Sequence, residues 1–225
     1  MSPRDWEPLW LSLRVATCAS IVIVALGLPL AWVLARARFP GKSVLAGVLL
    51  LPLVLPPTVL GYLLLLVFSR RAPLGAWLES TLGFSIVFHW SGAVIASAVA
   101  AFPLFLLPAR GALQGVPREL ENAARLLGHR EGSVLLRITL PLAWRGLAAG
   151  WVLAFARALG DFGATLMVAG NIPGRTQTAS LAIYDAVQVG DLARATGLTV
   201  AISLVALTSL VLVQSALGLR GRDLS

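Results

Sequence analysis

Long apolar segments alternate with short arginine-rich segments along this chain. Each apolar segment has about 20 residues or more, the length that a helix needs to cross the hydrocarbon core of a bilayer. The apolar segments are residues 9–35, 44–68, 85–108, 141–159 and 195–219. They are apolar on all sides rather than at alternate positions, which argues against the strands of a membrane barrel. The pattern predicts an all-α integral membrane protein with five transmembrane helices.

Composition and charge support a membrane location. The chain is 58% hydrophobic and 12% charged, with a mean hydropathy of +0.86, whereas soluble domains carry about 25% charged residues. The net charge is +8, and the positive residues gather between the apolar segments. Because this distribution follows the positive-inside rule of membrane proteins, we expect no nucleic-acid partner.

The arginines also predict how the chain is oriented. Most of them lie in residues 36–42 and 109–137, which fall on the same side of the membrane if the five spans alternate. That side is cytoplasmic by the positive-inside rule. The N-terminus then lies outside, whereas Arg220 and Arg222 after the last span lie inside. The two arginines at residues 70–71 fall on the outer side and are the exception.

Residues 160–191 are mixed in character. Residues 170–174 read Gly-Asn-Ile-Pro-Gly, which is a strong turn signal. The apolar part before it, residues 162–169, is too short to cross a bilayer, so we expect a re-entrant piece there. A sixth membrane segment is the alternative.

The long polar segment between the third and fourth spans predicts a short helix outside the membrane. Pro117 suits the start of a helix, and Glu119 and Glu121 follow where the helix dipole favours acidic side chains. Gly128 suits the left-handed position that ends a helix. A second short helix, over residues 130–138, leads into the fourth span.

One face of the first of these helices is apolar. The apolar positions recur at helical spacing and are Leu120, Ala123, Ala124 and Leu127. Such a helix either lies on the lipid headgroups or docks against a partner protein. The two alanines favour docking, because small side chains allow close approach, whereas a lipid-facing helix would carry larger aromatic residues.

No pattern in the chain predicts catalysis, a metal site or a cofactor. Residues 41–43 read Gly-Lys-Ser, but the glycine that a phosphate-binding loop needs five residues earlier is Arg36. We therefore expect no ATPase activity in this chain. His89 and His129 lie far apart in the sequence, without a cluster of metal ligands around either. An intramembrane enzyme would need paired polar catalysts within its spans. Arg157 and Asp161 come closest to such a pair, and Asp161 has no second carboxylate beside it.

The polar segment also contains a spaced motif. Residues 123–128 read A-A-x-x-x-G, and after nine further residues, residues 138–141 read I-x-L-P. This spacing resembles the E-A-A loop in the permeases of bacterial binding-protein-dependent ABC importers. The family's usual glutamate before the two alanines is Asn122 here, with Glu121 one place earlier. Asparagine keeps the hydrogen-bonding ability of that position and loses its charge.

Two further stretches narrow the resemblance. Residues 51–62 look like the second span of molybdate permeases, and so do residues 160–165 followed by residues 170–178. Together they cover most of the chain between residues 39 and 191. Tungstate and sulfate permeases are near relatives with altered versions of these stretches, and they remain alternatives.

The resemblance implies an architecture and a set of partners. It implies the type I ABC importer permease fold in one domain, residues 1–225, with a cytoplasmic coupling loop at about residues 109–140. It also implies a homodimer in the inner membrane, two cytoplasmic ATP-binding subunits, a molybdate-binding protein outside and lipid around the spans. A passive anion channel or carrier is the rival, since it would need no docking loop.

The resemblance further implies which residues couple the chain to the ATPase. They are Glu119, Leu120, Glu121, Asn122, Ala123, Ala124, Leu127 and Gly128.

Prolines in the second span indicate a candidate pathway. Pro52, Pro56 and Pro57 each remove a backbone donor, and broken backbone inside a membrane is tolerated where it lines a cavity. Thr58 and Tyr62 would offer hydroxyl groups to an anion from positions i and i+4. A kinked packing helix is the alternative.

A charged pair near the end of the fourth span is a second candidate. Arg157 and Asp161 are spaced i, i+4, and charges within the membrane are functional candidates. We interpret Asp161 as holding Arg157 or marking a gate hinge, since a carboxylate would repel an oxyanion. An ordinary helical ion pair is the alternative.

Overall fold

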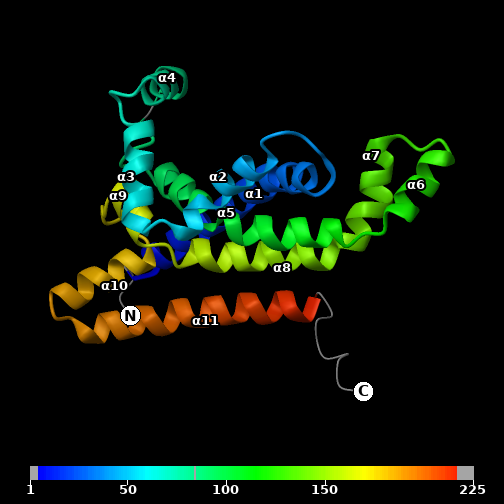
Figure 1. The fold of residues 1–225 in the computed structure, drawn as a ribbon. Coiled ribbons are helices and arrows are strands. Elements are labelled where there is room, and N and C mark those ends of the chain that lie inside the picture. The colour runs from blue at the N-terminus through cyan, green and yellow to red at the C-terminus, as the bar shows by residue number, and fades with distance from the viewer. Residues whose placement is uncertain (1–4, 84, 217–225) are drawn as a thin grey trace.

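The computed structural model describes residues 5–83 and 85–216, and the regular elements in that part of the chain are all helices (Figure 1). In chain order they are α1 (Trp6–Arg36), α2 (Lys42–Val54), α3 (Pro57–Phe68), α4 (Pro73–Leu82), α5 (Trp90–Gln114), α6 (Arg118–Leu126), α7 (Glu131–Val134), a π turn (Leu135–Thr139), α8 (Leu140–Leu159), α9 (Gly163–Ala169), α10 (Ala179–Gln188) and α11 (Leu192–Ala216).

Membrane-length helices dominate the fold. Four are long and apolar enough to cross a bilayer, namely α1, α5, α11 and the continuous helix Glu131–Leu159. The pair α2 and α3 makes a fifth span if it is counted as one. The predicted all-helical membrane fold is therefore confirmed. Arg220 and Arg222 lie outside the described residues.

The second predicted span is not one straight helix. α2 ends at Val54, α3 begins at Pro57, and the two helices are bent by 118°. Pro56 and Pro57 explain the break, because neither carries the backbone N–H that a continuing helix would need. Pro57 instead occupies the first position of α3, where the missing N–H would be unpaired anyway. Pro52 stays inside α2.

Two other boundaries differ from the prediction. α5 begins at Trp90 and continues to Gln114, into the segment that the sequence pattern assigns to the loop. The fourth span does not start at Pro141, because α7, the π turn and α8 form one helix from Glu131 to Leu159.

The π turn explains why Pro141 does not end this helix. A proline crowds the carbonyl four residues earlier and gives it no hydrogen-bond donor. Just before Pro141 the N–H of Leu140 bonds to the carbonyl of Leu135, five residues back. This wider turn gives the proline ring room within a continuous helix.

α5 lies at the centre of the bundle and packs against α1 and α8. Many of its buried positions are small, for example Ala93, Ala101 and Ala109. Small side chains let helix backbones approach closely, which favours association in lipid. Phe105 and Leu106 fill the wider gaps and are fully buried.

α9 packs closely against α3. A methyl group added to Gly61 would come within 2.6 Å of Cβ of Met167, and one added to Gly163 within 2.9 Å of Cβ of Pro57. The second contact involves the first residues of both helices. The break before α3 and the break before α9 therefore lie side by side.

Gly61→Ala is expected to destabilise the protein, because the added methyl group would have to displace Met167 or the backbone of Ala164. Such overpacking costs about 1–3 kcal/mol. The control is Gly47→Ala on α2, where the added methyl group meets no neighbour within 4 Å. We expect a lower midpoint of thermal unfolding in detergent for Gly61→Ala alone. Equal midpoints would contradict the close packing of α3 against α9.

Candidate coupling surface and transport pathway

α6 projects from the end of the bundle where α5 ends (Figure 1). Pro117 is its N-cap rather than its first helical residue. Glu119 and Glu121 lie in the first turn, as predicted. Gly128 follows the helix with φ of +85°, a left-handed conformation that glycine adopts without strain.

A buried ion pair holds α6 in place. Glu121 is only 3% exposed. Its Oε1 accepts hydrogen bonds from Nη2 of Arg36, at 2.7 Å, and from Oγ1 of Thr139, at 2.8 Å. Nη2 of Arg36 also donates to the carbonyl of Val116, at 3.2 Å. Because a buried carboxylate is costly unless it is paired, these bonds fix α6 to the end of α1 and to the π turn.

Two members of this cluster are not predicted from the sequence. Arg36 ends the first apolar segment and carries the ordinary signal of a cytoplasmic charge. Thr139 occupies the unassigned position of the I-x-L-P motif. Nothing in the local patterns connects Arg36 with Glu121, 85 residues later.

The apolar stripe of α6 is turned away from the protein. Leu126 is 89% exposed and Leu127 is 80% exposed, and Leu120 and Ala123 are exposed as well. Ala124 departs from the predicted stripe, because it is buried against the protein. Exposed apolar patches of this kind commonly mark sites of interaction.

Arg125 connects α6 to α7 across the turn at Gly128. Its Nε donates to Oε1 of Glu131 at 2.6 Å, and its Nη1 donates to Oδ1 of Asn122 at 2.7 Å. The hydrogen bond to Glu131 raises the pKa of Arg125. Asn122 stands where the resembled family has glutamate, and its side-chain oxygen accepts a hydrogen bond from Arg125 of the same chain.

The Arg157–Asp161 pair lies at the break between α8 and α9. Nη1 of Arg157 is 3.1 Å from Oδ1 of Asp161. The other carboxylate oxygen accepts from the backbone N–H of Thr165, at 3.0 Å, and from its hydroxyl, at 2.8 Å. Oγ of Ser97, on α5, lies 3.3 Å from the same hydroxyl. Asp161 is buried and uses both oxygens to hold the start of α9.

The two residues expected to offer hydroxyl groups to an anion lie on α3, next to this break. Thr58 and Tyr62 are exposed, as are Pro56 and Pro57 at the start of the helix. The backbone nitrogen of Thr58 is 3.5 Å from the place that a Cβ on Gly163 would take. The structure thus brings the candidates on α3 close to the start of α9.

α8 separates the coupling surface from the pathway candidates. Thr139 directly precedes α8, and Arg157 lies near its other end. At 1.5 Å per residue the 18 positions between them span about 27 Å. One unbroken helix therefore connects the anchor of α6 to the polar pair at the break.

Membrane-length helices, two adjacent helix breaks and a short helix with exposed leucines are the features expected of a membrane component of a transport system. The chain belongs to the family of binding-protein-dependent transport system inner membrane components, whose model matches residues 27–223. It is accordingly a multi-pass protein of the inner membrane.

Individual relatives and structures agree with this family. The chain is 47% identical over 188 residues to the molybdenum transport system permease protein ModB of Escherichia coli (strain K12), covering 84% of this chain and 82% of the relative. It is 44% identical to the putative molybdenum transport system permease protein YvgM of Bacillus subtilis (strain 168), covering 83% and 82%. A chain of the inward-facing MetNI methionine ABC transporter matches with a TM-score of 0.74 at 17% identity, over 99% of this chain and 100% of that chain. That match confirms the predicted importer permease fold.

Glu121→Gln is expected to loosen α6, because the largely buried guanidinium of Arg36 would lose its carboxylate partner. Removing one side of a buried ion pair costs about 3–5 kcal/mol. Deuterium exchange at the amides of α6 should become faster, while exchange in α5 stays unchanged. Glu119→Gln is the control, since Glu119 is an exposed acid in the same turn. The anchoring role is wrong if both variants exchange alike.

Proposed function

We propose that this chain is the permease subunit of an ATP-driven molybdate importer. It forms the path of the oxyanion and couples that path to a separate ATPase. The observation that carries this proposal is the 47% identity, over 84% of the chain, to a molybdenum transport system permease protein. Tungstate and sulfate are the alternative substrates, because they are also tetrahedral dianions.

The exposed face of α6 supports docking against an ATP-binding subunit. Its leucines would be buried by a partner, and the small side chain of Ala123 leaves room for close approach. The face carries no aromatic residue of the kind that anchors a helix in lipid headgroups. In this proposal the partner hydrolyses ATP, and this chain has no catalytic role.

Hydrogen bonds and ion pairs connect α6 to the candidate pathway through α8. The Glu121–Arg36 pair and Thr139 pass its movement to α1 and α8. α8 carries that movement to Arg157 and Asp161, and Asp161 is bonded to the start of α9. Because α9 packs against α3, the two helix breaks would move when the ATPases close. Alternating access then follows from rocking of these helices around the breaks.

Two copies of this chain would surround the path. α11 supports a homodimer, because only 11% of its membrane-length stretch is buried within the chain. Leu204, Leu207 and Val211 are exposed on it. A second copy would cover part of this surface, and lipid would cover the rest. Each copy would act as one domain, residues 1–225, with residues 109–140 as its coupling loop.

The two ends of the dimer would bind different partners. Two ATP-binding subunits would dock on the two α6 helices in the cytoplasm. A molybdate-binding protein would deliver the ion at the opposite, extracytoplasmic end. This arrangement follows from the family, whose description names a binding-protein-dependent system.

Uptake of labelled molybdate into proteoliposomes tests the function. The vesicles would hold this chain with its partner ATPase, with the binding protein outside and ATP inside. We expect uptake that requires ATP and that tungstate blocks but sulfate does not. Uptake without ATP would favour a channel or carrier. ATP-driven uptake of sulfate, without uptake of molybdate, would keep the fold and change the substrate.

Ala123→Phe is expected to uncouple ATP hydrolysis from uptake, because the ring would stand on the docking face and leave the buried Glu121 pair intact. Loss of about 1.4 kcal/mol from docking would weaken binding of the ATPase roughly tenfold, and the uptake per ATP hydrolysed should fall. Ala123→Ser is the matched control, since it stays small, and it should keep most of the uptake. Unchanged coupling in Ala123→Phe would remove α6 from the docking surface.

A further inference from the structure

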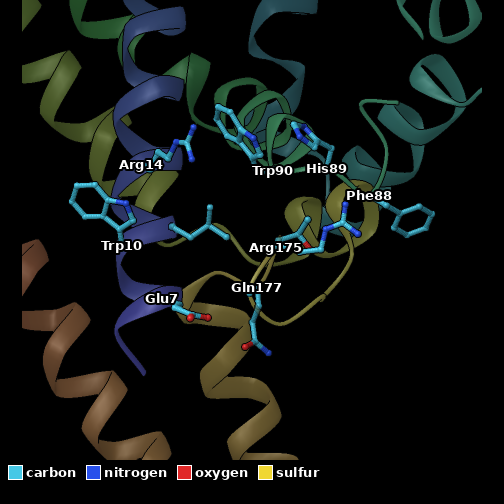
Figure 2. Close-up of a pocket in the computed structure, with 11 residues that line it drawn as sticks. Glu7, Trp10, Arg14, Phe88, His89, Trp90, Arg175 and Gln177 are labelled. Carbon is cyan, nitrogen blue, oxygen red and sulfur yellow. The ribbon is translucent and has the colours of Figure 1, made fainter. Parts of the chain in front are cut away.

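A cavity of about 370 Å³ lies at the end of the bundle opposite α6. It is lined by the first turns of α1, the start of α5 and the loop between α9 and α10, and it opens to the surface. Figure 2 shows Arg14 reaching from α1 toward the indole of Trp90, with His89 and Arg175 farther along the cavity. By the predicted orientation this end faces outward, away from the ATPases.

Two arginines give the cavity its charge. The guanidinium carbon of Arg14 is 4.1 Å from the centre of the Trp90 ring, so an aromatic face supports it without using its N–H donors. Neither Arg14 nor Arg175 forms an ion pair within residues 5–83 and 85–216. Glu7 is the one acid among the described lining residues, and Figure 2 shows it beside Gln177, apart from Arg14.

Arg14 lies inside the first membrane-length helix, where a charged residue is costly and is a functional candidate by default. The charge within the apolar segment 9–35 is the sequence signal that could have identified this site.

His89 lies in the positive electrostatic field of the cavity. Its Nδ1 accepts a hydrogen bond from the backbone N–H of Ser91, at 3.3 Å, and so caps the start of α5. Burial, and then the charges of Arg175 and Arg14, lower the pKa of the imidazole. An uncharged imidazole agrees with both the accepting Nδ1 and the lowered pKa of His89. The positive charge that lines the cavity therefore belongs to the two arginines.

The cavity leads toward the pathway helix. A neighbouring depression of about 790 Å³ shares Phe88, His89 and Arg175 with it. The same depression is lined by Leu65, and by Arg71 just beyond the outer end of α3. A basic surface therefore connects the cavity to the helix that carries Thr58 and Tyr62.

We propose that this cavity is an outer binding site for a tetrahedral oxyanion, with Arg14 and Arg175 as the cations that line it. Guanidinium groups bind such anions through several charge-assisted hydrogen bonds. The cavity has room for the anion and part of its hydration, since a water molecule occupies about 30 Å³. Positive groups at the mouth of a path also raise the local concentration of an anion.

Two sources can supply this chemistry. One is the transported ion. Only this choice of ligand depends on the proposed function. The other is the phosphate of a lipid headgroup, because Trp10 lines the cavity and is 68% exposed. Exposed tryptophans near the end of a membrane helix are typical of the membrane interface.

Equilibrium binding of labelled molybdate tests the site. The sample would be this chain with its partner ATPase in nanodiscs of phosphatidylcholine, without the binding protein. We expect Arg14→Gln and Arg175→Gln each to weaken binding roughly tenfold. Arg175 lies on an exposed loop, so its variant does not threaten the fold. Arg70→Gln is the control for the cavity itself, because Arg70 pairs with Glu79 and lines the neighbouring depression but not the cavity.

A second set of nanodiscs separates the two sources. With phosphatidylglycerol present, a headgroup site would retain this lipid in native mass spectrometry, and Arg175→Gln would release it. Retained lipid that also competes with molybdate supports the site with a lipid ligand. Molybdate binding that phosphatidylglycerol leaves unchanged supports it with the transported ion. Equal molybdate binding by wild type, Arg14→Gln and Arg175→Gln, with no lipid retained, would overturn the proposal.

The binding experiment and the uptake experiment test the proposed site and the proposed function separately. If labelled molybdate binds at this site and the proteoliposomes take up only sulfate, the site stands and the proposed substrate is wrong. If ATP-driven molybdate uptake is normal and neither arginine variant changes molybdate or lipid binding, the function stands and the site is wrong.

Discussion

Glu121 carries a negative charge where water barely reaches it, and the placement of α6 depends on how that charge is satisfied. Only a cation and hydrogen-bond donors at the same spot can compensate for the lost hydration. Arg36 and Thr139 provide them from two different helical segments. Because all three must meet, α6 has one position relative to α1 and the π turn. The apolar face of α6 is consequently directed away from the protein.

The other end of α8 meets a different constraint. Irregular backbone inside a membrane needs internal partners for its polar groups. Asp161 supplies an acceptor to the first turn of α9, and Arg157 compensates for the charge of that acceptor. The break at Pro56 lies against the same region through Gly163. One end of α8 is thus tied to a rigid anchor, and the other end adjoins two interruptions where helices can change direction.

Local patterns predict those parts of the structure that local physics determines. Apolar length predicts the spans, and arginine distribution predicts which loops share a side. Pro117, Glu121 and Gly128 predict α6 because capping and dipole effects act within one or two turns. The prolines predict a break in the second span, but not its angle of 118°. The helix that continues through Pro141 is missed, because a proline has the same local effect whether or not the chain around it compensates. The contact of Arg36 with Glu121 and the cavity around Arg14 join distant segments. Local patterns do not encode the partners, although the charge of Arg14 within an apolar segment is a local signal for the cavity.

The contact between Arg36 and Glu121 also bears on how the chain is assembled. The two residues can meet only if the loops after the first and third spans emerge on the same side of the membrane. A chain that had inserted one of these spans the wrong way round would leave both charges apart, and α6 would not be held with its leucines outward. Thr139 is made last of the three, so the contact is completed only after the third span has been synthesised. The pair can therefore form only in a chain whose first and third spans are threaded so that both loops emerge on one side.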